Sequence, residues 1–289
     1  MGININVDLG NLVPYAVDSF LRFIGKDSEA VELREWFRAV QQTGIQESSV
    51  VMVIGMHSPM PLDAIYQPTR LILEAPIEVV QLPTGEKKQV QLEDQTLTPR
   101  QFVAKGIDGV LFAGPGWGKT TLLHYLFMTT LRENKNVVPV LFTLRRPSGL
   151  ADFRKFIDVL RKLKKRGSRQ TKFLLLVDGY DEVSTAERKE ISDALMLFAV
   201  SDAGNYLLTC RDFYDVYELR AGRLRIGEFS EGDQLRLCYR FYWRLWGRHS
   251  RRRASSGPAS ARSSRPTAAS PVTRDGMYRK DWEGWFVFP

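Results

Sequence analysis

Cysteine and histidine are scarce in this chain of 289 residues, which holds two cysteines and three histidines. Cys210 and Cys238 stand in unrelated contexts, so neither a disulfide framework nor a metal-binding spacing can be built from them. The sequence has no run of about 18 consecutive apolar residues, the length that a membrane-spanning helix needs. Its first residues also lack the basic-then-apolar pattern of a secretion signal. These absences predict a cytoplasmic protein that has no membrane partner.

The net charge of +8 is unevenly distributed along the chain. The segment 247–289 holds nine Lys or Arg residues against three Asp or Glu residues and is otherwise rich in Ala, Ser and Pro. Because such a composition buries too little apolar surface to order itself, we expect 247–289 to be a disordered basic tail of low complexity. The rest of the chain is close to neutral, so its overall charge says little about its partners.

Residues 1–97 are expected to form a small α+β region that leads into the main domain. A helix is predicted from Ser28 to Gly44, because Asp27 is a typical start signal and Gly44 is a typical stop signal. Two β-rich runs, 70–82 and 89–92, flank a turn-forming segment and predict a β-hairpin. No residue type in this region indicates chemistry.

From residue 98 to residue 246, apolar strands alternate with amphipathic helices. The expected strands are Gly109–Ala113, Val137–Thr143, Lys172–Val177 and Tyr206–Thr209, and the expected helices are Gly118–Arg132, Leu150–Arg166 and Thr185–Val200. This alternation is typical of a parallel sheet that is covered by helices on both faces. We therefore predict an α/β fold with three layers, helix–sheet–helix, in which ligands bind beyond the carboxyl ends of the strands.

A glycine-rich stretch lies between the first of these strands and the next helix. It reads Ala113-Gly114-Pro115-Gly116-Trp117-Gly118-Lys119-Thr120-Thr121. Apart from Ala113, which stands where glycine is usual, it follows the phosphate-loop pattern G-x-x-x-x-G-K-[ST]. Glycines let backbone N–H groups approach phosphate oxygens, and the N-terminus of the following helix adds its dipole. Lys119 is expected to contact the β- and γ-phosphates, and Thr120 to bring a hydroxyl group to Mg²⁺. The stretch from Gly114 to Thr121 thus predicts a site for ATP or ADP with Mg²⁺.

An acidic cluster follows the third expected strand, whose apolar run ends at Asp178. A carboxylate at the tip of a buried strand needs a charged partner, and a Mg²⁺ ion held by Thr120 and the phosphates would supply one. Asp178 and Thr120 are therefore the predicted metal ligands. Glu182 is the candidate that polarises the attacking water, and Asp181 could assist either task. The alternative is that this acidic pair only opens the next helix, where acidic side chains suit the helix dipole.

Arg211 stands at the end of the fourth expected strand, after Leu-Thr-Cys. In a sheet of this type the strand end lies near the γ-phosphate, so Arg211 is a candidate for sensing that phosphate and for stabilising the transition state. The alternative is a surface ion pair with Asp212 or Asp215. We count Arg211 with Glu182 and Asp181 as the candidate catalytic residues.

Taken together, these motifs resemble the NACHT family, a branch of the signal-transducing (STAND) P-loop ATPases. The resemblance covers roughly residues 60–246 and depends on the glycine-rich loop, on Asp178-Gly179-Tyr180-Asp181-Glu182 and on Leu208-Thr209-Cys210-Arg211. Residues 62–71 are similar to the segment that precedes the domain in relatives, which implies that Tyr66 and Pro68 lie near the adenine. Residues 229–246 resemble the first helix of the helical domain that follows in relatives.

The resemblance implies a nucleotide-controlled switch. In the family, ADP holds a closed monomer, exchange for ATP permits self-association, and slow ATP hydrolysis limits signalling in innate immunity, apoptosis or defence against phage. It also implies sensor and effector partners, which the sequence does not identify. Relatives continue beyond this point with the rest of the helical domain, a winged helix and a sensor, so we expect a truncated form whose reading frame changes near residue 247 and which binds nucleotide weakly.

Two other functions remain open on the sequence alone. The first is a nucleic-acid-dependent ATPase of the related AAA type, which would use the basic stretch 154–166. However, Phe153, Phe156, Ile157, Leu160 and Leu163 form an apolar stripe there, which favours a helix with a solvated basic face, so nucleic acid is not an expected partner. The second is a non-enzymatic interaction fragment that binds sister subunits through its N-terminal helices.

Overall fold

The computed structural model describes residues 15–51, 59–75, 77–81, 87–134, 136–145, 149–212, 216 and 219–240. These residues belong to one compact unit, and the predicted tail 247–289 lies outside them. Within the described ranges, no helix combines the length and apolar character required to cross a membrane.

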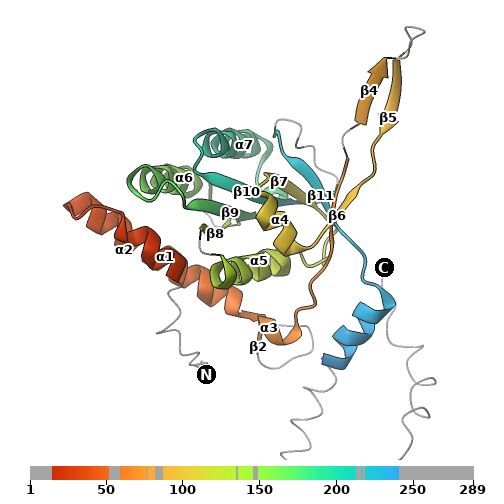
Figure 1. Cartoon of the computed structure of the whole chain (residues 1–289), viewed down its shortest axis with the longest axis horizontal. Coiled ribbons are helices and arrows are strands. Elements are labelled where there is room, and N and C mark those ends of the chain that lie inside the picture. Colours follow the sequence, from red (N-terminus) through yellow and green to blue (C-terminus); the bar gives the residue numbers. More distant parts are fainter. Residues whose placement is uncertain are drawn as a thin grey trace, which may run out of the picture. The chain divides into compact units, whose positions relative to one another are not determined.

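Seven strands form the central sheet, in the order β6-β3-β11-β7-β10-β9-β8 (Figure 1). Five of them are parallel: β7 (Gly109–Phe112), β8 (Val137–Thr143), β9 (Lys172–Asp178), β10 (Gly204–Cys210) and β11 (Gly222–Ile226). The other two are β3 (Leu71–Leu73) and β6 (Gln95–Leu97). Strand β3 pairs antiparallel with both of its neighbours, β11 and β6. The four strands predicted for this sheet are β7 to β10. Strand β3 lies within the predicted β-rich run 70–82, and β6 and β11 were not expected from the sequence.

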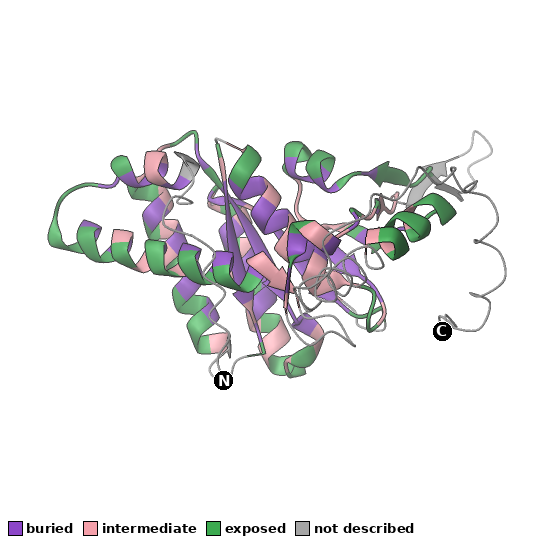
Figure 2. Ribbon diagram, turned by 90° about the horizontal axis from the view of Figure 1, so that it is seen from below, coloured by how far each residue is buried: buried purple, intermediate pink, exposed green. Residues whose placement is uncertain are grey.

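Helices cover both faces of the sheet. Helix α5 (Lys119–Glu133) lies on one side, and α6 (Gly149–Arg166) and α7 (Thr185–Val200) lie on the other (Figure 1). Buried residues gather on the central strands and on the inward sides of the helices (Figure 2). Because helices cover both faces of the sheet, the sequence of β9 is an almost continuous apolar run and does not alternate between apolar and polar residues. The predicted three-layer α/β architecture around a mostly parallel sheet is confirmed.

Helix α2 (Ser28–Ser49) continues five residues beyond its predicted end at Gly44. Its predicted start is correct, because the Asp27 carboxylate accepts a hydrogen bond of 2.8 Å from the backbone N–H of Ala30. The predicted stop was wrong for a steric reason. A Cβ atom at Gly44 would lie 2.6 Å from Cζ of Phe127 in α5, so this glycine lets two helices pack closely and does not end one.

The same helix α2 covers the edge of the sheet at β8. The buried Gln41 side chain donates a hydrogen bond of 2.9 Å to the backbone carbonyl of Pro139. Proline has no N–H group to offer, so it is usually found on edge strands, where a neighbouring strand does not need that donor. A side chain of α2 therefore satisfies a carbonyl group that a neighbouring strand would otherwise bind.

The predicted hairpin is present, but it is part of a longer ribbon. Strands β4 (Ile77–Gln81) and β5 (Lys87–Gln91) are antiparallel, with Ile77 opposite Gln91. In the central sheet Leu73 lies opposite Gln95. Leu73 is four residues before Ile77 and Gln95 is four residues after Gln91, so the same register continues through both strand pairs. The predicted run 70–82 is therefore divided between the sheet and the hairpin. Segments on both sides of residue 98 contribute to one central sheet.

The remaining elements are short; the longest of them are α1 (Tyr15–Arg22) and a helix over 231–240. The others are β1 (Val50–Val51), β2 (Met60–Pro61), α3 (Leu62–Ile65), α4 (Pro99–Lys105) and a 3-10 helix (Tyr180–Glu182). The helix 231–240 lies within the segment that resembles the start of a helical domain. It begins at Ser230, whose hydroxyl group donates to the Asp233 carboxylate (2.6 Å) and accepts from its backbone N–H.

Candidate nucleotide site

The glycine-rich loop connects β7 to α5 and leaves the N-terminus of that helix open. Gly116 and Gly118 have φ angles of 80° and 81°, a conformation that side chains with a Cβ atom rarely adopt. No side chain caps α5 at Gly118, so the first N–H groups of the helix are available to an anion. The half-exposed Trp117 lies beside Gly114, where an added Cβ would be 3.1 Å from the indole nitrogen.

Lys119 lies across the start of the loop. Its ammonium group donates to the carbonyl oxygens of Ala113 (2.6 Å) and Gly114 (3.0 Å). Ala113 is almost fully buried in the core, and its N–H donates to the carbonyl of Cys210 in β10. The methyl group that departs from the phosphate-loop pattern is therefore accommodated at the end of β7.

The loop and the tip of β9 meet directly. The Thr120 hydroxyl group donates a hydrogen bond of 2.8 Å to Oδ2 of Asp178, whose exposed fraction is 3 %. The structure thus brings together the two predicted metal ligands, although their role as ligands stays a prediction. Among the described residues, no basic side chain forms an ion pair with Asp178, and both donors to its carboxylate are neutral hydroxyl groups.

Thr209 is the second donor, and sequence reasoning did not single it out. It is fully buried in β10, and its hydroxyl group donates to Oδ1 of Asp178 at 2.6 Å. The hydroxyl oxygen of Thr209 in turn accepts a hydrogen bond of 3.1 Å from the N–H of Gly179. In the sequence, only its position two residues before the candidate Arg211 distinguishes Thr209 from an ordinary strand residue.

The candidate catalytic residue Arg211 forms an ion pair with another candidate, Asp181. The distance from Nε of Arg211 to Oδ2 of Asp181 is 2.7 Å, and the Asp181 side chain is 5 % exposed. The described ion pair of Arg211 is therefore not the surface pair with Asp212 that the sequence left open. Asp215, the other alternative partner, lies outside the described residues.

Glu182 forms an ion pair with Arg145, which the sequence analysis did not name. Nε of Arg145, two residues beyond the end of β8, lies 2.6 Å from Oε2 of Glu182. The feature of the sequence that could have identified Arg145 is its position, two residues after the carboxyl end of the buried strand β8. Helix α7 is opened by Ser184 and Glu187, which form a capping box. The acidic pair precedes this cap, so it does not merely open the helix.

Tyr66 packs on the helix that follows the phosphate loop. Its ring stacks on Tyr125 of α5 with centroids 4.4 Å apart, and burial raises the pKa of its phenol group to about 12. The carbonyl of Tyr66 accepts a hydrogen bond of 2.6 Å from Arg240, in the helix 231–240. Pro68 is exposed two residues later. The placement of Tyr66 and Pro68 near an adenine stays a prediction.

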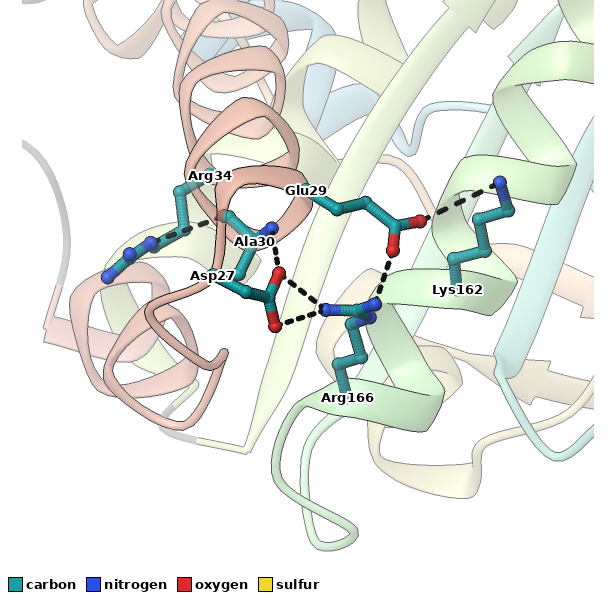
Figure 3. Close-up of polar contacts among 6 residues, drawn as sticks. All are labelled: Asp27, Glu29, Ala30, Arg34, Lys162 and Arg166. Atoms are coloured by element: carbon teal, nitrogen blue, oxygen red, sulfur yellow. Dashed lines mark hydrogen bonds and ion pairs between the residues drawn. The ribbon is translucent and has the colours of Figure 1, made fainter.

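The basic face of α6 is engaged by the start of α2. Arg166 forms ion pairs with Asp27, at 3.0 Å, and with Glu29, and Lys162 lies 4.0 Å from Glu29 (Figure 3). Beneath these charges the predicted apolar stripe is buried: Phe153, Phe156, Ile157, Leu160 and Leu163. The stripe prediction is confirmed, and part of the basic face is balanced by acidic residues of the same chain.

Comparisons with known proteins add little to this geometry. No family model matches the chain, and no curated protein matches it. Among solved structures, PCH-2 from C. elegans is similar over 75 % of this chain and 48 % of its own, with 13 % identity and a TM-score of 0.34. The cytoplasmic domain of the Thermomonospora curvata type VII secretion ATPase EccC is similar over 56 % of this chain and 22 % of its own, with 12 % identity and a TM-score of 0.31. This chain therefore spans less than half of either structure, and similarity at this level carries no conclusion about activity.

Proposed function

We propose that this chain is a nucleotide-binding module that takes ATP or ADP with Mg²⁺ and hydrolyses ATP slowly. The observation that carries the proposal is the hydrogen bond between Thr120 and Asp178. It joins a lysine-bearing glycine loop, which follows β7, to a buried carboxylate at the end of β9, two strands away in the sheet. This arrangement supplies positive charge for phosphates and hard oxygen atoms for a metal in one place.

The oxygen atoms of Thr120 and Asp178 fit Mg²⁺, which prefers hydroxyl, carboxylate, phosphate and water oxygens. When bound, this ion neutralises charge that develops on the transferred phosphoryl group. Lys119 leaves the carbonyls of Ala113 and Gly114 and binds phosphate oxygens. The open N-terminus of α5 holds the same oxygens through its backbone N–H groups.

Two acid–arginine pairs set the resting state of the site in this proposal. Arg211 is held by Asp181, and Glu182 is held by Arg145. A γ-phosphate competes with Asp181 for the guanidinium group of Arg211, which makes Arg211 sensitive to the third phosphate. Glu182 orients the attacking water once its carboxylate turns away from Arg145.

The finer part of the proposal is a NACHT-type switch that acts in signalling or defence and self-associates in its ATP state. It is supported by the sequence resemblance at Asp178–Glu182 and at residues 208–211, and by a helix at 231–240 where that family begins its helical domain. The ion pairs between α6 and the start of α2 favour this reading over a nucleic-acid-dependent ATPase, because they neutralise charges that such an ATPase would need. Comparison of the oligomeric state in ADP and in ATP, by light scattering, tests the switch.

Thermal unfolding with ATP, ADP or GTP, each with Mg²⁺, tests the nucleotide site. A ligand at 100 times its Kd stabilises a protein by about 2.7 kcal/mol, which raises the Tm of a domain of this size by about 5–10 °C. We expect this rise in the parent protein and in the control variant Lys189→Ala, whose lysine is exposed on α7. Lys119→Ala should show no rise. An equal rise in Lys119→Ala, or none in the parent, contradicts the proposal.

A further inference from the structure

Strand β10 lies between the strand that leads into the phosphate loop and the strand that carries Asp178. Thr209 of β10 is opposite Leu111 of β7, and its neighbour Leu208 is opposite Val177 of β9. This register sets the Thr209 side chain beside the first residue beyond Val177, which is Asp178. Because both strands are buried and parallel, this neighbour relationship is fixed by backbone pairing.

Both hydrogen-bonding functions of the Thr209 hydroxyl group are used. Its single proton is donated to Oδ1 of Asp178 at 2.6 Å, and its oxygen accepts from the N–H of Gly179 at 3.1 Å. The Gly179 N–H is a donor and cannot accept, so the proton of the Thr209 hydroxyl group points to the Asp178 carboxylate. Thr209, with an exposed fraction of 0 %, has no contact with water that could replace either bond.

Two hydroxyl groups therefore hold the two oxygens of one carboxylate. Thr209 donates to Oδ1 from β10, and Thr120 donates to Oδ2 from the loop. With both oxygens bonded from different elements, the carboxylate plane is fixed before any ligand arrives. Residues that orient a metal ligand in this way commonly influence metal affinity by about 10–100-fold, although they never touch the metal.

We propose that Thr209 is a positioning residue for metal–nucleotide binding, which acts by holding Asp178 in the orientation that faces Thr120. This inference rests on the proposed nucleotide site. It differs from a purely structural role, because a residue that only stabilises β10 would influence binding of nucleotide equally with and without the metal. Dependence on the metal is therefore the property to measure.

The experiment is calorimetric titration of the full chain with ATP, once with excess Mg²⁺ and once with EDTA. Thr209→Val keeps the shape of the side chain and removes both hydrogen bonds, whereas Thr209→Ser keeps the hydroxyl group. Thr130→Val is the matched control, because Thr130 is equally buried but lies in α5, away from Asp178. All four proteins are first compared by circular dichroism.

We expect Thr209→Val to lower the affinity for ATP with Mg²⁺ by about 10–100-fold and to leave the affinity in EDTA unchanged. Thr209→Ser should restore most of the loss, and Thr130→Val should behave as the parent protein. If Thr209→Val does not fold, Thr209→Cys takes its place, since a thiol is only a weak donor.

Three outcomes overturn parts of the argument separately. If the parent protein binds ATP in neither condition, the proposed nucleotide site itself is wrong. If the parent binds and Thr209→Val binds ATP with Mg²⁺ as tightly as the parent, Thr209 does not position Asp178. An equal loss of affinity in Mg²⁺ and in EDTA assigns Thr209 a structural role only and overturns the inference.

Discussion

The contact between Gly44 and Phe127 permits a quantitative test of how α2 packs on the helix of the phosphate loop. The change is Gly44→Ala. In an exposed helix this substitution would stabilise the protein by about 0.5–1 kcal/mol, because alanine loses less conformational entropy. Here the new Cβ atom would lie 2.6 Å from Cζ and 2.9 Å from Cε2 of Phe127. Carbon atoms in contact prefer a separation of about 3.5–4.0 Å, so the helices must shift by roughly 1 Å.

Overpacking of this kind costs about 1–3 kcal/mol, which exceeds the gain in helix propensity. We therefore expect Gly44→Ala to lower the free energy of unfolding by about 1–2 kcal/mol, as measured by urea unfolding monitored by circular dichroism. The second arm is the same change in a Phe127→Leu background, where the ring is absent. There Gly44→Ala should be neutral or stabilising, and the coupling energy between the two sites should be about 1–3 kcal/mol.

Two results would refute this reasoning. Gly44→Ala could stabilise the parent protein as it would on a solvent-exposed helix. Alternatively, the change could have the same effect with and without the Phe127 ring, in which case the steric contact does not determine the outcome. The slope of the free energy against urea concentration should remain constant across all four proteins, so that stability alone is compared.

Two further predictions concern the site and its surroundings. Glu182→Gln should retain ATP binding but lose ATP hydrolysis, measured by phosphate release. Glu35→Gln, a control at an exposed position on α2, should retain both. Hydrolysis by Glu182→Gln at the parent rate would rule out the proposed role of Glu182. Burial, followed by the charge of Asp181, raises the pKa of the Cys210 thiol to about 12, above its ordinary value of 9.0. The pKa of this thiol is higher in the folded state than in the unfolded state. The contribution of the Cys210 thiol to the free energy of unfolding is therefore complete below pH 9 and is lost as the pH rises toward 12. Urea unfolding at several pH values should therefore show stability falling above pH 9, and constant stability up to pH 11 would contradict this.

Local patterns in the sequence were sufficient for the central part of the fold. Strands β7 to β10 are apolar runs of four to seven residues, and α5 to α7 have helical periodicity, so each was predictable from its own segment. Strands β6 and β11 were not, because they are short and carry polar residues. Strand β3 lies within the predicted run 70–82, but its place in the central sheet was not predicted. Leu224 of β11 pairs with Leu73, about 150 positions earlier, and no local window contains that information.

The candidate site divides in the same way. The phosphate loop and Asp178 were found because residue type and spacing alone indicate their chemistry. Arg145 and Thr209 were missed because their importance comes from partners distant in sequence: Glu182 in the 3-10 helix after β9, and Asp178 at the end of β9. Gly44 was misinterpreted because a glycine that ends a helix and a glycine that admits a neighbouring ring look the same in sequence.

The hydrogen bond from Gln41 to Pro139 has a consequence for assembly. It closes the β8 end of the sheet to strand addition, and among the described strands this leaves β6 as the end where a partner's backbone could pair. Two copies could join β6 to β6 across a twofold axis, but a sheet that grows at one end only cannot run through three or more copies. Growth of the central sheet itself would therefore stop at a pair of copies.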